Sequence, residues 1–356
     1  MFNVTFLPAT YGDSIWIEYG TSQKHYILID GGTAGTRRYI KNKVADIPSA
    51  DPHLELVVVS HIDRDHIAGV LSILSRGELN ATIGDIWFNG WKHLPEPENE
   101  TFGAKQGEQL TDEIIAKQIP WNKAFGENAV TTGDSGDLPV VELDGGMKLT
   151  ILSPSPEGLA DLKPVWKQEV LDAGLEPGGA YQDDTTVSDA DGDERFTAGD
   201  LPDIEALAQT PFYSDDSEAN GSSIAFIAEY NNKRVLFAAD AHIPQLLSTL
   251  NQLYPGEKAQ IDLCKVSHHG SKGTVSREFV EKLDCAKFAF STNGSLYYHP
   301  HREAVARVIH GSGGNPELYF NYKSDENKIW GLIESQYDFK THYPENDQSG
   351  VTISVS

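Results

Sequence analysis

Residues 57–69 read VVVSHIDRDHIAG and place four residues with metal-binding side chains directly after a run of valines. The valines predict a buried strand, and the apolar spacing that follows predicts a helix. Between the two, His61, Asp63, Asp65 and His66 lie within six residues. Imidazole and carboxylate groups bind borderline and hard divalent cations, so this spacing predicts one loop that serves two adjacent metals. The alternative is a solvated acidic loop in which an aspartate caps the helix.

Two further apolar stretches end in residues of the same chemical kind. Residues 235–239 lead into Asp240, and residues 263–267 lead into His268 and His269. A carboxylate at the end of a buried strand needs a strong partner, so we predict that Asp240 bridges two metals, with a helix cap as the alternative. Successive strand residues face opposite ways. We therefore expect one of the two histidines to bind metal and the other to support it or to act on the substrate.

Other polar residues are candidates for supporting roles. Asp30 closes an apolar strand, which favours a carboxylate that orients a metal ligand, with a simple turn former as the alternative. Asn220 and Ser222 precede a predicted hairpin. We expect them to form hydrogen bonds near the metals, and ordinary turn residues are the alternative. His299 stands before a proline and is a candidate for the edge of the site.

The composition is that of a folded and acidic protein. The chain has 356 residues, 39% of them hydrophobic, and 28 Lys and Arg against 53 Asp and Glu give a formal charge of −25. That charge repels a phosphate backbone unless bound metal or a basic patch reverses the field. Cys264 and Cys285 lack zinc-site spacing and are expected to be reduced. The sequence has no membrane-spanning stretch and no signal-peptide pattern, which predicts a cytoplasmic protein that does not enter membranes.

Two β-rich halves with outer helices predict one domain over residues 1–356, an αββα four-layer sandwich of the α/β class. The second half is expected to end in a strand near residues 329–334. Between the halves, residues 89–216 are rich in Pro, Gly, Asp and Glu, and we predict a long insertion there. Its helical segments and tryptophans indicate that part of it packs against the metal-bearing edge and narrows access to it.

The motifs taken in order resemble the metallo-β-lactamase superfamily, and most closely the hydrolase domain of ComEC/Rec2-type competence proteins. Asp63 stands here at the second His position of the general H-x-H-x-D-H motif, as in that branch. Where β-lactamases have a third-motif His, this chain has Asn220 and Ser222. The resemblance covers roughly residues 1–75 and 218–335. It rests on residues 4–7, 12–15, 27–32, 61–66, 220–223, 239–241, 265–271 and 298–301.

The resemblance implies a hydrolase with two divalent metal ions, Zn²⁺ or Mn²⁺, and a metal-bridging hydroxide as the nucleophile. The function it implies is a phosphodiesterase acting on nucleotides or nucleic acid, with a protein partner that supplies a basic surface for longer substrates. The alternatives are a hydrolase of another ester, phosphorylcholine-type or thioester, and a metal-poor binding or regulatory module. The catalytic residues are predicted to be Asp65, Asp240 and His299. The implied metal ligands are His61 and Asp63 at one ion, Asp65 and His66 at the other, Asp240 between them, and His268 or His269.

Overall fold

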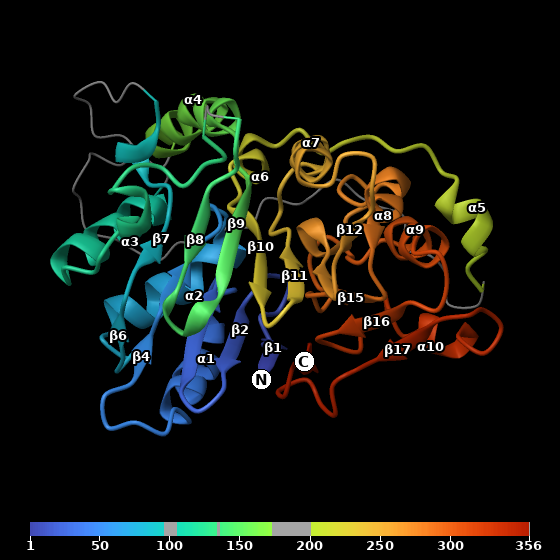
Figure 1. The fold of residues 1–356 in the computed structure, drawn as a ribbon, viewed down its shortest axis with the longest axis horizontal. Coiled ribbons are helices and arrows are strands. Elements are labelled where there is room, and N and C mark those ends of the chain that lie inside the picture. Colours follow the sequence, from blue (N-terminus) through green and yellow to red (C-terminus); the bar gives the residue numbers. More distant parts are fainter. Residues whose placement is uncertain (96–104, 134–135, 173–200, 356) are drawn as a thin grey trace.

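Two β-sheets lie face to face at the centre of the molecule, and helices cover the outer face of each (Figure 1). We describe the protein from a computed structural model, which covers residues 1–95, 105–133, 136–172 and 201–355. The four layers confirm the predicted αββα sandwich of the α/β class.

The first sheet has six strands, most of them from the N-terminal residues. Its parallel part joins three strands whose carboxyl ends therefore lie at one edge of the sheet. In spatial order the strands are β18 (Val351–Ser354), β1 (Phe2–Phe6), β2 (Ile15–Gly20), β3 (Lys24–Ile29), β5 (Leu56–Val58) and β7 (Ile86–Trp87), the last three being the parallel ones.

The second sheet has eight strands, and its strands from β11 to β17 run parallel. The β10–β11 hairpin turns at Asn231 and Asn232, which both have positive φ, as a primed two-residue turn requires. In spatial order the strands are β17 (Lys340–His342), β16 (Glu317–Phe320), β15 (Lys287–Phe290), β13 (Leu263–Lys265), β11 (Lys233–Phe237), β10 (Ala225–Tyr230), β9 (Lys148–Ser153) and β8 (Val140–Glu142).

Helices form the two outer layers, and short elements complete the chain. The helices are α1 (Arg37–Ala45), α2 (Arg64–Ser75), α3 (Lys105–Ala116), α4 (Pro156–Asp172), α5 (Ile204–Ala208), α6 (Glu218–Gly221), α7 (Ile243–Leu253), α8 (Arg277–Lys282), α9 (Arg302–Gly311) and α10 (Trp330–Ile333). Two minor sheets pair β4 (His53–Leu54) with β6 (Thr82–Ile83) and β12 (Ala259–Gln260) with β14 (Leu283–Asp284). The 3₁₀ helices are η1 (Ala34–Thr36), η2 (Trp91–His93), η3 (Lys123–Phe125), η4 (Asp144–Gly146) and η5 (Ser267–Gly270).

Three hydrophobic cores follow from these layers. The core between the sheets takes alternate residues of each strand, such as Phe2, Val4 and Phe6 of β1, because side chains of a strand point to opposite faces in turn. A second core packs α1, α2 and α3 against the first sheet, and a third packs α7, α8 and α9 against the second sheet. Each fully buried large apolar side chain contributes about 1.5–3 kcal/mol to folding. The cores hold both sheets rigid, which fixes where the strand ends lie.

The segment 89–216 is partly built into the sandwich. Strands β8 and β9 lie within it and extend the second sheet, and the insertion itself stays a prediction. Trp91, Trp121 and Trp166 are buried in the core beneath α2 and α3. The predicted narrowing of access to the metal edge stays a prediction, and residues 173–200 of the segment lie outside the described ranges.

One predicted strand is wrong. Residues 329–334 were expected to extend a sheet, but they contain the short helix α10. Trp330 and Ile333 are both buried, and a spacing of three places them on the same side of a helical turn. The short apolar run fits a strand and a helix equally well, so periodicity could not distinguish the two.

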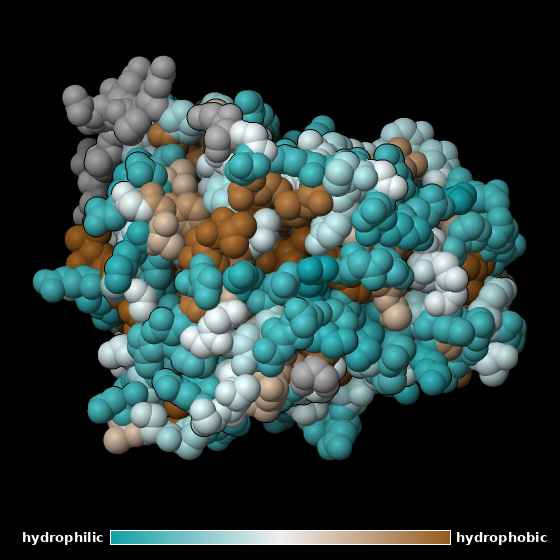
Figure 2. Space-filling model, viewed as in Figure 1, coloured by the Kyte–Doolittle hydropathy of each residue, from teal (hydrophilic) through white to brown (hydrophobic). Residues whose placement is uncertain are grey.

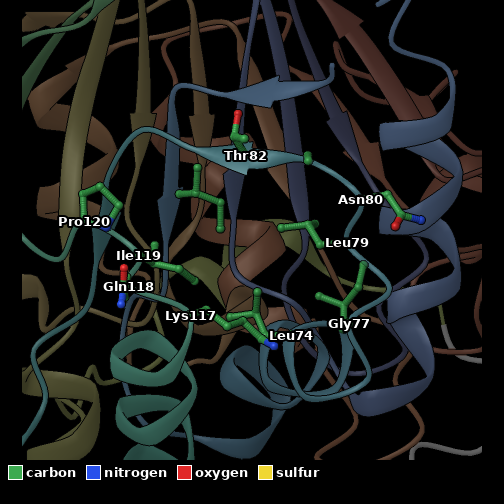
Figure 3. A pocket seen from close by; sticks show the side chains of 12 residues that line it. Leu74, Gly77, Leu79, Asn80, Thr82, Lys117, Gln118, Ile119 and Pro120 are labelled. Atoms are coloured by element: carbon green, nitrogen blue, oxygen red, sulfur yellow. The ribbon is translucent and has the colours of Figure 1, made fainter. Parts of the chain in front are cut away.

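The surface offers few further clues to function. The face in Figure 2 is mostly hydrophilic, and its more hydrophobic area lies over the part where Figure 1 draws β8 to β10. A cavity of about 460 Å³ opens between the end of α2, β6 and the end of α3, lined by apolar side chains such as Leu74, Leu79 and Ile119 (Figure 3). None of its lining residues is one of the predicted site residues. Within the described part of the chain, no helix is long and apolar enough to cross a membrane.

Candidate metal centre

The predicted site residues follow parallel strands of both sheets. Asp30 comes directly after β3, and residues 61–66, called the loop 61–66 below, run from the end of β5 into the first turn of α2. Asp240 follows β11 closely, and His268 and His269 follow β13. Because the carboxyl ends of parallel strands share an edge, the two sheets bring residues distant in sequence to one place.

The ligand candidates of the loop 61–66 are two buried histidines and two partly exposed aspartates. His61 and His66 are buried, and Asp63 Oδ2 lies 3.4 Å from His61 Nε2. Asp63 is the N-cap of α2, yet its side chain makes no capping hydrogen bond. The capping alternative therefore does not account for Asp63, whose carboxylate faces an imidazole instead.

Asp240 lies at the centre of the cluster and is itself buried. Its Oδ2 is 3.2 Å from His66 Nε2 and 3.5 Å from His269 Nε2. The same oxygen is 3.9 Å from His61 Nε2 and 4.0 Å from His268 Nε2. One carboxylate oxygen thus faces four imidazole nitrogens, which is the arrangement that a shared ligand of two cations requires.

Hydrogen bonds orient two of these rings. His66 Nδ1 is 2.8 Å from Asp30 Oδ2, and His269 Nδ1 donates to the carbonyl of Ser291 at 2.8 Å. A donor at Nδ1 leaves the Nε2 lone pair free for a metal. The Nε2 atoms of His66 and His269 lie 3.3 Å apart, and His269 Nε2 is 3.3 Å from Asp65 Oδ2. Asp30 thus has the geometry of the orienting role predicted for it.

His268 is held by neighbours that the sequence analysis did not connect. Its Nδ1 is 3.0 Å from Asp215 Oδ2, which also accepts a hydrogen bond from Asn220 Nδ2 at 2.6 Å. The expected alternation along a strand does not apply, since His268 and His269 lie in η5 with φ values of 46° and 53°. Both rings can therefore approach Asp240, with His269 buried and His268 partly exposed.

Three charged residues near the cluster were missed as functional candidates: Asp13, Asp215 and Lys265. Lys265 is fully buried and forms an ion pair with Asp13, and its Nζ is 3.6 Å from Asp240 Oδ1. Asp13 together with His66, Asp240 and His269 forms a buried group with the spacing of a metal site. A buried lysine at the end of a short strand gives no local pattern to detect, because its partners come from two distant loops.

His299 and Ser222 are the two remaining candidates. His299 lies against histidine rings of the cluster, whereas Ser222 forms a hydrogen bond within its own turn. His299 is buried, and its ring centroid is 5.2 Å from that of His268 and 6.2 Å from that of His269. Burial and the neighbouring histidines hold the pKa of His299 well below its usual range, so its ring is neutral. Ser222 donates to the carbonyl of Ala219 in its own turn, which matches the ordinary turn residue that was its alternative.

The charges of the cluster call for a cation. Burial lowers the pKa of His66 and of His269, but nearby carboxylates, Asp240 first, raise both, that of His269 to about 10. Burial raises the pKa of Asp240, yet the histidines bring it well below its usual range. Carboxylates in this setting draw protons onto imidazoles, and a divalent cation can take the place of those protons.

The buried atoms that have no hydrogen-bond partner in the described structure include His61 Nε2 and Asp240 Oδ1, although both lie near charged groups. A buried polar atom without a partner costs about 1–3 kcal/mol. For His61, the free Nε2 points toward the carboxylates of Asp63 and Asp240, so an ion between them would satisfy it. The mixed nitrogen and oxygen donor set suits zinc and manganese. The residues present therefore fit a divalent metal centre.

Known proteins with distant similarity to this chain include one in sequence and several in structure. No protein-family model matches the chain. ComE operon protein 3 of Bacillus subtilis (strain 168) is 27% identical over 158 residues, which cover 43% of this chain and 19% of that protein. The chain thus corresponds to only a small part of that relative.

Solved structures with similar folds include three proteins of low sequence identity. Human tRNase Z, short form, aligns with a TM-score of 0.45 at 8% identity and covers 99% of each chain. A diphosphatase of the PhnP family gives 0.43 at 11%, covering 100% of this chain and 98% of its own. Zn²⁺-bound PqqB from Methylobacterium extorquens gives 0.44 at 10%, covering 99% of each. The two-sheet sandwich with helices on both outer faces is the αββα fold predicted from the sequence, and its Asp/His cluster lies at the strand ends.

Proposed function

We propose that this chain is a metal-dependent hydrolase that cleaves phosphodiesters. The observation that carries the proposal is the single oxygen of Asp240 facing four histidines, with two more aspartates beside them. A buried cluster of this composition is costly to fold unless it binds cations. Function follows from such a site more than from the fold, which hosts many activities.

The donors divide into two groups around Asp240. His61 lies next to Asp63, and Asp65, His66 and His269 lie next to one another. Asp240 belongs to both groups, and His268 reaches the same oxygen. We assign each group to one divalent ion, Zn²⁺ or Mn²⁺, with Asp240 between them. When bound, two such ions would activate a water and stabilise the charged oxygens of a displacement at phosphorus.

The remaining residues fix this arrangement. Lys265 faces Asp240 Oδ1, so only Oδ2 points into the donor groups. Asp30 and Ser291 hold the rings of His66 and His269, which limits the motion of both ligands. His299 stays neutral beside His268, and a neutral imidazole can donate a hydrogen bond to a leaving oxygen. We assign this role to His299, together with the predicted catalytic roles of Asp65 and Asp240.

The net negative charge of the chain limits the length of nucleic acid that it can bind by itself. With a formal charge of −25, the protein has little affinity for a long nucleic acid by itself. A nucleotide or a short single strand carries few phosphates and can be bound mainly through the metals. Longer substrates would need a partner protein with a basic surface. The match to ComE operon protein 3 supports the comparison with competence proteins, but it covers too little of that protein to transfer its activity.

The proposal is tested by substrate hydrolysis with metal-free and metal-loaded protein. The purified protein is treated with a chelator, reloaded with zinc or manganese, and assayed on bis(p-nitrophenyl) phosphate, a single-stranded oligonucleotide and a β-lactam. We expect phosphodiester cleavage only after reloading, and its loss in Asp65→Asn and His66→Ala. The exposed acid Asp51 provides the control Asp51→Asn, which should keep full activity. Cleavage of the β-lactam alone would refute the proposal.

A further inference from the structure

Two loops beside the candidate metal centre are tied to each other. The loop after β1 contains Tyr11, and the loop after β15 contains Tyr297. The backbone N–H of Asn293 donates to the carbonyl of Thr10 at 2.8 Å, and the backbone N–H of Asp13 donates to the carbonyl of Asp65 at 3.2 Å. The two loops and the turn at Asp65 therefore form one connected rim.

The second loop holds its tyrosine in an unusual backbone conformation. Tyr297 and Tyr298 have φ values of 44° and 54°, in the left-handed region that residues other than glycine rarely adopt. Such conformations persist where the surrounding structure imposes them, and they cluster at functional sites. The side chain of Tyr297 nevertheless remains 42% exposed, so burial in the core does not explain its position.

The ring of Tyr297 continues a line of rings that starts at the metal cluster. Its centroid is 5.9 Å from that of His299, and the His299 centroid is 6.2 Å from that of His269. Partial burial raises the pKa of Tyr297, and Asp65 and Asp63 raise it further; burial and Asp65 do the same for Tyr11. A phenol with its ordinary pKa of about 10 is already uncharged at neutral pH, and the raised pKa keeps both tyrosines in this form.

We propose that Tyr11 and Tyr297 form an aromatic subsite that stacks on a planar ring of the substrate, next to the phosphate held at the metals. This inference rests on the proposed function and narrows its substrate class to phosphodiesters that carry a nucleobase. An uncharged aromatic face suits this acidic rim, since it binds a base without attracting or repelling the phosphate. Stacking of one base on an aromatic side chain contributes about 1–3 kcal/mol, which corresponds to roughly 5-fold to 150-fold in affinity.

The test compares ligands that differ only in the base. Binding of thymidine 5′-phosphate and of deoxyribose 5-phosphate to the metal-loaded protein is measured by calorimetry, for the wild type, Tyr297→Ala and Tyr297→Phe. We expect the wild type to bind thymidine 5′-phosphate more tightly by roughly 5-fold to 150-fold. Tyr297→Ala should lose most of this preference, and Tyr297→Phe should keep it. Tyr337 is equally exposed at 42% and lies in another part of the chain, so Tyr337→Ala is the matched control.

Kinetics separate this inference from the proposed function. The p-nitrophenyl esters of the same two phosphates are assayed with each variant, and Tyr297→Ala should raise KM for the thymidine ester with little change in kcat. If neither ester is cleaved but the base preference depends on Tyr297, the proposed function fails and the subsite stands. A wild type without base preference, or a preference that survives in Tyr297→Ala, overturns the subsite.

Discussion

At the scale of single residues, the two oxygens of the Asp240 carboxylate face different partners. Its Oδ2 faces histidines and its Oδ1 faces the buried Lys265, whose other partner is Asp13. A buried charge persists only with such partners. The aspartate after a buried strand was predictable from sequence. The lysine opposite it was not, because its role depends on two loops that meet only in the folded chain.

Asp215 should matter for metal binding although it is not a ligand candidate itself. Its carboxylate fixes Nδ1 of His268, and loss of such an orienting group typically costs 10-fold to 100-fold in metal affinity. We expect Asp215→Ala to weaken zinc binding by about that factor, as measured by competition with a chromophoric chelator. The exposed neighbour gives the control Asp216→Ala. Equal affinities in the two variants would contradict the orienting role.

Metal affinity should rise with pH. Burial lowers the pKa of His269, but nearby carboxylates raise it to about 10. The metal-free site therefore holds a proton that the cation must displace. Below that pKa, each displaced proton changes the apparent affinity about tenfold per pH unit, with weaker binding at lower pH. Titrations with zinc between about pH 6 and pH 8 measure this slope. An affinity that does not vary over this range would show that no proton is released.

At the scale of elements, the strand ends were predictable and the backbone after them was not. Apolar runs ending in Asp or His predicted where β5, β11 and β13 stop to within a few residues. The alternation argument for His268 and His269 was wrong, because both residues lie in a tight turn with positive φ. Such a turn has no period to detect, although Gly270 at its end has a positive φ that favours glycine.

The backbone of helix α2 packs closely against the backbone of the loop after β3, which positions the helix. A Cβ atom on Gly69 would collide with the backbone carbonyl of Gly31, so glycine is required for this contact. We expect Gly69→Ala to lower the free energy of unfolding by about 1–3 kcal/mol and to weaken metal binding, because α2 carries His66. Urea unfolding measures the first effect. Gly35 has no atom within 4 Å of such a Cβ, and Gly35→Ala should leave stability nearly unchanged. Equal unfolding midpoints for the two variants would contradict this packing argument.

At the scale of the whole molecule, two sheets from distant parts of the chain complete one site. The first sheet supplies the loop 61–66 and the second supplies Asp240, His268 and His269. The order of motifs predicted this sandwich. The segment 89–216 was less predictable, since its polar composition hid β8, a short strand at the edge of the second sheet, and β9 next to it. Asp215, near its end, supports His268 through a contact that no local pattern indicates.

The central claim is that the Asp/His cluster binds two divalent ions through Asp240. The measurement that tests it most directly is the number of metal ions per chain, determined by elemental analysis after loading with zinc or manganese and removal of free metal. We predict two ions per wild-type chain, and one or none in Asp240→Asn with the fold retained by circular dichroism. A folded wild type that retains no metal, or an Asp240→Asn variant that still holds two ions, would contradict this account.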